Sequence, residues 1–364
     1  RGIAMLADIL IVSVVSLLKI GAVIAGLLTV VAYGSYAERR VSAIIQDRLG
    51  PNRVGPYGLL QPLADGIKFM WKEDFIPRSA DRILFVLAPI MILVPSLMAF
   101  AVIPFGNILT IPEFSFFGVF TVPQITTALQ IIDLNVGILY ILGTTSIAVY
   151  GIAIGGFSAN NKWSLLGGVR ASAQMVSYEL SLGLSLVGVL MITGSLQMSQ
   201  IVGSQTEGAL GGLLTWNIFR QPLGFLIFVV AAFAENNRLP FDMVEAEQEL
   251  VGGYHTEYSS MKFSMFMIAE YANMTTASAL MATLFFGGWH IPFLSGSDIN
   301  PLLLSILEVG AFIGKTLIFV FIYIWVRWSL PRFRYDQLMA IGWKVLLPFA
   351  LINVVLTAVV MLVF

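Results

Sequence analysis

The chain has 364 residues, of which 58% are hydrophobic and only 11% are charged, whereas a soluble domain carries about 25% charged residues. This composition predicts an integral membrane protein, and the balance of 20 Lys and Arg against 21 Asp and Glu identifies no partner. The sequence has no cysteine and two distant histidines, His255 and His290, which excludes iron–sulfur ligation, disulfides and a histidine-rich metal cage in this chain.

Eight apolar stretches are long enough to cross a bilayer core, which needs about 20 apolar residues. The connections between them alternate in charge: the odd-numbered ones hold 16 of the 20 Lys and Arg, whereas the opposite side has only Arg1 and Arg220, and Lys19 and Lys315 lie within spans. By the positive-inside rule, the odd-numbered connections face the cytoplasm (or matrix or stroma) and both termini lie on the outer side. The sequence therefore predicts an all-α polytopic membrane protein, a single transmembrane domain over residues 1–364. Its eight transmembrane helices are expected at 9–36, 82–104, 134–157, 171–195, 222–238, 262–288, 302–327 and 344–364.

The first cytoplasmic loop, residues 38–81, is the longest connection. Turn signals at 50–52 and 55–58 precede apolar residues at helical spacing between Leu59 and Trp71, which predicts a short amphipathic helix on the membrane surface. Orientation by the positive-inside rule is one explanation of the positive charges of this loop. The Gly/Pro turns and Asp65 do not serve orientation, and they favour a shaped mouth at the depth where an amphiphile would enter.

Several ionisable residues fall inside the predicted spans. Glu179 lies in the fourth span and Glu270 in the sixth, and a charge at the bilayer centre costs at least ~2.5–3.5 kcal/mol. Such residues usually face a bundle interior and mark proton or ion paths, which is the function expected here, with a purely structural polar contact as the alternative. Lys315 in the seventh span is open between a path and an ion pair with Glu308, and Lys19 is expected to extend its amine to the outer interface.

An acidic cytoplasmic loop covers residues 235–261, with Arg238 as its one cation. The loop is typical either of a solvated acidic helix or of a proton relay, because clustered carboxylates raise one another's pKa towards neutrality. Its acids are Glu235, Asp242, Glu245, Glu247, Glu249 and Glu257.

Six strings of the sequence resemble subunit 1, in bacteria the H subunit, of respiratory complex I, the proton-pumping NADH:quinone oxidoreductase. The likeness runs over nearly the whole chain and in order. The strings are ERR at 38–40, DRLGPNRVGPYGLLQPLADGIK at 47–68, VRASAQMVSYEL at 169–180, PFDMVEAEQELVGGYHTEY at 240–258, MIAEYANM at 267–274 and PRFRYDQLM at 331–339.

The resemblance implies an integral subunit of a bacterial cell inner membrane that borders the passage of a quinone, either ubiquinone or menaquinone. FMN and iron–sulfur clusters would lie in partner subunits. The expected partners are the hydrophilic quinone-site and iron–sulfur subunits, small membrane subunits, antiporter-like subunits and the lipid bilayer, with no nucleic acid. The family's quinone-chamber positions match Arg39, Arg48, Asp65 and Arg327. Its proton-coupling positions match Glu179, Glu235, Asp242, Glu245, Glu247, Glu249 and Glu270.

One position departs from the family pattern, because Ile147 stands where some relatives have a glutamate, so a proton path through that position is absent. Two alternative functions remain open. A related subunit of a membrane-bound nickel–iron hydrogenase or ferredoxin-linked complex would need no quinone, and the intact first loop favours the quinone function. A stand-alone ion-coupled transporter would need helices broken near the middle of the membrane, and few Gly or Pro residues interrupt the spans.

Overall fold

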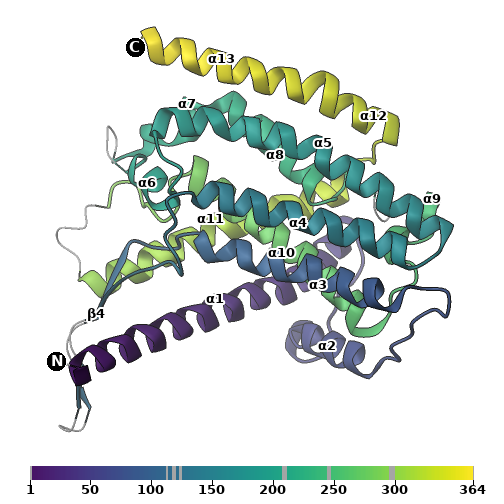
Figure 1. Ribbon diagram of the computed structural model, residues 1–364, viewed down its shortest axis with the longest axis horizontal. Helices are drawn as coiled ribbons and strands as arrows, with labels where there is room; N and C mark the ends of the chain where they lie inside the picture. The colour runs from purple at the N-terminus through teal and green to yellow at the C-terminus, as the bar shows by residue number, and fades with distance from the viewer. Residues whose placement is uncertain are drawn as a thin grey trace.

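A computed structural model describes residues 2–111, 114–116, 120–122, 125–206, 211–243, 247–294 and 300–363. Long helices run side by side along the molecule, and the two ends of the chain lie at the same end of the bundle (Figure 1). The long elements are α1 (Gly2–Ile45), α3 (Arg82–Met98), α4 (Gly137–Ser158), α5 (Lys162–Thr193), α8 (Pro222–Glu235), α10 (Ser260–Phe285), α11 (Pro301–Ser329) and α13 (Leu347–Val363).

Six helical segments within the described residues are long and apolar enough to cross a membrane, which supports the predicted polytopic membrane protein. They are Ser13–Ile45, Arg82–Val102, Gly137–Ser158, Lys162–Thr193, Pro301–Ser329 and Tyr335–Val363. Helices also form at the other two predicted spans. There, α8 is apolar but has only 14 residues, and α10 has 26 residues with polar side chains along its length. Polar residues are tolerated in α10 because its neighbours α1, α3 and α11, rather than lipid, surround it.

The first predicted loop begins later than the sequence indicated. The helix α1 continues to Ile45, so residues 38–45 are helical and not part of a loop. The reason is local: no helix breaker occurs between Glu38 and Gly50, so the helix outlasts its apolar run. After the turns, the 3-10 turn η1 (Pro56–Gly58) leads into the short helix α2 (Gln61–Trp71), which lies near the end of the bundle opposite the chain termini (Figure 1).

The second connection contains strands that the all-α prediction did not include. Strand β1 (Ile108–Ile111) pairs antiparallel with β4 (Ile125–Ala128), and β2 (Phe114–Phe116) pairs with β3 (Phe120–Val122). The ladder pairs Ile108 with Ala128 and Ile111 with Ile125. We call this region the hairpin, and it marks the end of the bundle at which the chain begins (Figure 1).

Short elements complete the connections. They are the 3-10 turns η2 (Ala99–Val102), η3 (Leu213–Thr215) and η4 (Gly253–His255), the helices α6 (Met198–Gly203), α7 (Asn217–Arg220), α9 (Glu247–Leu250) and α12 (Tyr335–Ala340), and a π-helical segment at Ile341–Leu346 that joins α12 to α13.

A glycine lets η4 pack directly on α5. A Cβ atom added to Gly167 would lie 2.7 Å from the backbone nitrogen of Tyr254, which is closer than real Cβ atoms approach. The turn that follows α9 is thereby held against the bundle. Its Tyr258 ring stacks on Phe85 of α3 with centroids 4.0 Å apart.

Candidate functional site

An open cavity of about 460 Å³ lies where α1, α2, α10 and α11 meet. One part of its wall is apolar and includes Leu28, Val31, Phe69, Ile268 and Trp328. The other part is charged and is formed by Glu38, Arg39, Asp65, Arg238, Glu270, Tyr271 and Arg327. The cavity thus presents both an apolar wall and a polar end.

An ion pair joins α1 and α2 at the outer rim of this cavity. A guanidinium nitrogen of Arg39 lies 2.7 Å from an Asp65 oxygen, and the Gln61 amide donates to the other oxygen at 3.0 Å. The Arg39 side chain is half exposed, so the pair contributes about 1 kcal/mol or less and opens readily.

Deeper in the cavity lies a buried group of charges that we call the charge cluster, namely Glu38, Arg238, Glu270, Tyr271 and Arg327. Arg238, only 2% exposed, lies 2.8 Å from Glu38 and 2.6 Å from Glu270. Arg327 lies 2.6 Å from the second Glu38 oxygen, and the Tyr271 hydroxyl donates to Glu38 at 2.7 Å. Two arginines thus balance two glutamates, which is what buried charges require.

Arg238 retains unused donor capacity. Its guanidinium lies over the Tyr271 ring at 4.5 Å, and its Nη2 is buried without a hydrogen-bond partner among the described residues. Because guanidinium carries five N–H donors, a bound water or another oxygen acceptor could be accommodated there. The cluster is therefore paired in charge but not saturated in hydrogen bonds.

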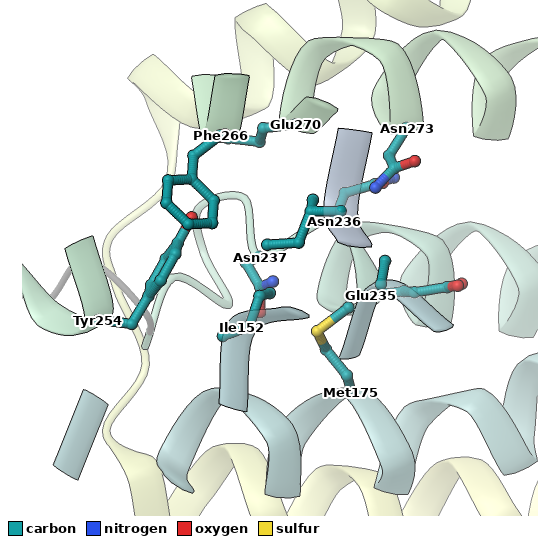
Figure 2. A pocket seen from close by; sticks show the side chains of 11 residues that line it. Ile152, Met175, Glu235, Asn236, Asn237, Tyr254, Phe266, Glu270 and Asn273 are labelled. Atoms are coloured by element: carbon teal, nitrogen blue, oxygen red, sulfur yellow. The ribbon is translucent and has the colours of Figure 1, made fainter. Parts of the chain in front are cut away.

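Behind the charge cluster lies a smaller cavity of about 40 Å³ (Figure 2). The side chains of Glu270, Asn237, Asn273 and Glu235 lie around it, and the Oδ1 atoms of Asn237 and Asn273 are buried without partners in the described parts of the chain. Ile152, Met175 and Phe266 form an apolar part of its wall, and the space is large enough for about two or three water molecules at its polar side. The unpartnered amide oxygens supply acceptors for such waters.

A third cavity of about 30 Å³ continues from the second. It shares Glu235, Asn236 and Asn273 with its neighbour and adds Thr145 of α4. The Thr145 hydroxyl lies within hydrogen-bonding reach of Glu235, and the Glu179 carboxyl is near enough to repel it. Glu179 itself accepts a hydrogen bond from Ser146. Acidic side chains therefore follow one another from the large cavity to α5.

The structure thus brings together most of the residues singled out from the sequence. Arg39, Asp65, Arg327 and Glu270 line the large cavity, while Glu235 leads from Glu270 to Glu179.

Other predicted site residues line none of these cavities or lie outside the described residues, although Asp242 is near enough to Glu270 to repel its carboxyl. Arg48 donates to Gln46 at 2.7 Å and to Ser42 at 3.3 Å. Glu249 is 54% exposed and lies 2.7 Å from Arg170 on the surface. Asp242 is buried, and its backbone oxygen accepts from Arg332. Glu245 and the side chain of Glu247 lie outside the described residues.

The sequence reasoning did not select Glu38, Arg238 or Tyr271 as site residues. Glu38 stands at the end of an apolar run and Arg238 is the one cation among the acids, so both carried a signal that charge matching could have used. Lys315 does not form the ion pair with Glu308 that was one of its two predicted roles. Its amine donates instead to three backbone oxygens, those of Phe286, Gly288 and His290.

Burial shifts the pKa of two groups in the turn between α9 and α10. It lowers the pKa of His255 to about 4, and the ring packs against Tyr254 and Phe263. Burial raises the pKa of Tyr258 to about 12, against the opposing effect of its hydrogen bond with Ser158. Both side chains are therefore neutral near pH 7.

Comparison with known proteins identifies the relatives of this chain. Residues 18–358 match the family model described as NADH dehydrogenase. The second H subunit of the NADH-quinone oxidoreductases of Koribacter versatilis is 52% identical over 351 residues, 94% of this chain and 96% of that protein. The first H subunit of Cytophaga hutchinsonii is 50% identical over 337 residues, 93% and 94% of the two chains. NADH-quinone oxidoreductase subunit 8 of Rhodothermus marinus is 50% identical over 333 residues, which are 89% of this chain and 90% of that protein.

These matches confirm the resemblance that the sequence strings indicated, and they cover the cavities and the charge cluster. The chain belongs to the NADH dehydrogenase family, among the H subunits of NADH-quinone oxidoreductase, and is a membrane subunit of that enzyme complex, respiratory complex I.

Proposed function

We propose that this chain forms the quinone-access chamber of complex I and couples quinone reduction to proton translocation. The observation that carries the proposal is the sharing of acids between cavities. Glu270 lines both the large cavity and the first small one, and Glu235 lines both small ones. An event in the large cavity therefore has a polar route towards Glu179.

The large cavity suits a quinone in size and chemistry. Small-molecule sites typically have volumes of about 300–1,000 Å³, and the apolar wall offers contacts for an isoprenoid tail. Chamber roles are proposed for Arg39, Arg48, Asp65 and Arg327. In this proposal, a hydrophilic partner subunit supplies the ligands of the quinone head group, and partner subunits also hold FMN and the iron–sulfur clusters.

Coupling in this proposal is electrostatic. Reduction of quinone creates negative charge and demands protons, which disturbs the balance among Glu38, Arg238 and Glu270. Arg238 can respond because it contacts both glutamates, and water in the small cavities would carry a proton between Glu270 and Glu235. The proton-coupling residues are Glu179, Glu235, Asp242, Glu245, Glu247, Glu249 and Glu270, and the signal would continue to antiporter-like partner subunits.

The proposed topology has eight transmembrane helices with both termini outside, in a bacterial inner membrane. The charge cluster then lies towards the cytoplasmic side, where the first and fifth connections meet. Support comes from the helices at all eight predicted positions and from the positive residues of the odd-numbered connections.

Glu270→Gln and Glu179→Gln test the coupling role. In the assembled complex, we expect quinone reduction and the associated proton transport in vesicles to fall about tenfold or more, since each variant removes a group that can hold a proton. Electron transfer from NADH to ferricyanide should stay at the wild-type rate because it requires only partner cofactors.

Glu308→Gln is the matched control, because Glu308 also lies in an apolar helix but hydrogen-bonds the Asn107 backbone away from these cavities. Wild-type quinone reduction and pumping in both Glu179 and Glu270 variants would refute the proposed route.

A further inference from the structure

One buried amide joins the two ends of the turn that follows α8. The Gln174 side chain of α5 is fully buried, and its Nε2 donates to the backbone oxygen of Ala234 at 2.7 Å and to that of Phe241 at 2.6 Å. Both amide hydrogens are therefore used, one at each end of the segment 234–241.

This turn carries the residues that connect the cavities. Glu235 and Asn237 line the small cavity, and Arg238 bridges Glu38 and Glu270 in the charge cluster. The turn has backbone hydrogen bonds of its own: the Asn237 amide donates to the Ala234 oxygen at 3.2 Å and the Phe241 amide to the Arg238 oxygen at 2.9 Å. These bonds shape the turn, whereas the Gln174 side chain ties it to α5. A clamp at both ends limits how far Arg238 can move relative to α5.

The same helix also carries Glu179, five positions after Gln174, and Met175, whose side chain lines both small cavities. The helix α5 is thus the common support for Glu179 and for the turn that bears Glu235. A shift of the turn would change the distance between Glu179 and Glu235. The same shift would also change the ion pairs of Arg238 in the charge cluster.

We propose that Gln174 is a positioning residue that sets Arg238 and Glu235 against Glu179 through its two backbone hydrogen bonds. This role rests on the proposed coupling function. A glutamine suits it because the side chain must donate twice; a carboxylate donates nothing, a protonated carboxyl donates once, and a methionine of similar length never donates.

The test compares Gln174→Met and Gln174→Glu in the assembled complex. Quinone reduction, normalised to NADH:ferricyanide activity, should fall about tenfold in Gln174→Met, because small misplacements of catalytic groups have effects of at least this size. In Gln174→Glu the loss should be greatest near pH 8, where an ionised carboxylate donates nothing and faces two backbone oxygens. It should diminish as pH falls to about 5.5, because burial raises the pKa of a carboxyl and the protonated form restores one donor. The methionine variant should show no such recovery relative to wild type.

Gln205→Met and Gln205→Glu are the matched controls. Gln205 is equally buried and its amide donates to Ile201 and Thr283 oxygens at 3.1 Å each, but it lies away from the three cavities. These variants should keep wild-type quinone reduction per assembled complex. Gln174→Glu has nearly the native size, so the experiment does not depend on assembly of the methionine variant.

Wild-type activity in the Gln174 variants, or identical pH profiles of the two, would overturn the positioning role. The proposed function is judged separately: if Glu179→Gln and Glu270→Gln lose coupling while the Gln174 variants behave like those of Gln205, only the positioning role fails.

Discussion

Charged side chains within the apolar helices serve two different purposes. Those of the charge cluster face a cavity, whereas Lys19, Glu308 and Lys315 bind backbone groups. Lys19 donates to the Ala128 backbone oxygen and also to the Thr127 hydroxyl in the hairpin, and Glu308 accepts from the Asn107 backbone. Depth in the membrane therefore does not by itself identify a residue that carries protons, since backbone oxygens and amides also satisfy a buried charge.

Lys315 should matter for stability rather than for pumping. Replacing it by Met leaves three carbonyl groups after α10 without their donor, at about 1–3 kcal/mol for each group that stays buried. We expect a lower midpoint of thermal inactivation of the purified complex and an unchanged ratio of protons moved to NADH oxidised. Loss of pumping with unchanged thermal stability would contradict this assignment.

His255 should make the complex less stable in acid. Its pKa is about 4 in the folded protein, below the ordinary value of 6.5, so the unfolded state binds the proton more tightly. Stability from this group is complete above pH 6.5, declines as pH falls, and is lost below about 4. At pH 5.5 the loss amounts to about 1.4 kcal/mol. Thermal inactivation measured at pH 7.5 and 5.5 should differ less in His255→Phe than in the wild type. An equal difference would show that other groups set the acid sensitivity.

The site residues divide according to how far apart in sequence their partners lie. Glu179 and Glu270 could be predicted because a lone acid in an apolar helix is visible in the sequence. Glu38 and Arg238 could not be paired in advance, because they are 200 positions apart and meet only when α1 and the turn after α8 converge. The Gln174 clamp is likewise invisible, since its acceptors are backbone oxygens that every residue type provides.

Among the elements, α2 is placed by contacts with the start of α10. The Lys262 amine lies 2.5 Å from Asp74, the Ser260 hydroxyl donates to the Phe69 oxygen, and the Ser259 hydroxyl donates to the Glu73 oxygen. These bonds fix the wall of the large cavity that carries Asp65. Helical periodicity predicted the helix itself, but not its partner, because a surface helix leaves its docking position unspecified. The strands of the hairpin were missed because each has only three or four residues, too few to show the alternating pattern of a strand in the sequence.

Breaking the Lys262–Asp74 pair should weaken quinone binding. Lys262→Met frees the segment after α2, and we expect the KM for quinone to rise about fivefold, equivalent to about 1 kcal/mol, with a smaller effect on kcat. The charge-exchanged double variant Lys262→Asp with Asp74→Lys should recover much of the loss. The pair Arg334 and Asp336, 3.4 Å apart and largely exposed, is the control and should tolerate Arg334→Met. An unchanged KM in Lys262→Met would show that the pair does not shape the chamber.

At the scale of the whole molecule, the arrangement of helices places the hairpin at one end and the charge cluster towards the other. Both chain ends lie with the hairpin (Figure 1), which agrees with an even number of crossings. Six segments of the described residues are long and apolar enough to cross a membrane, and the other two predicted spans fall on the short α8 and the polar α10, which both contribute to the candidate site. The polar residues that a site requires make a span less apolar, so the spans that form the site are the hardest to predict from hydropathy.

The absence of cysteine makes the topology directly testable. In intact cells, a membrane-impermeant maleimide should label Phe293→Cys and Leu214→Cys, which replace exposed residues of the connections expected outside. Lys162→Cys and Ser329→Cys should react only after the membrane is opened. Labelling of residues 214 and 293 from opposite sides would exclude the eight-span topology.

The shortness of α8 has an electrical consequence. Its 14 residues extend for about 21 Å, whereas the hydrocarbon core is about 30 Å thick. In the proposed topology, Glu235 at its end therefore stands about a third of the way into the membrane from the cytoplasmic surface. A proton that reaches it crosses about that fraction of the transmembrane voltage, or about 0.7 kcal/mol per 100 mV. The first step of proton uptake would then already work against the gradient that the complex builds.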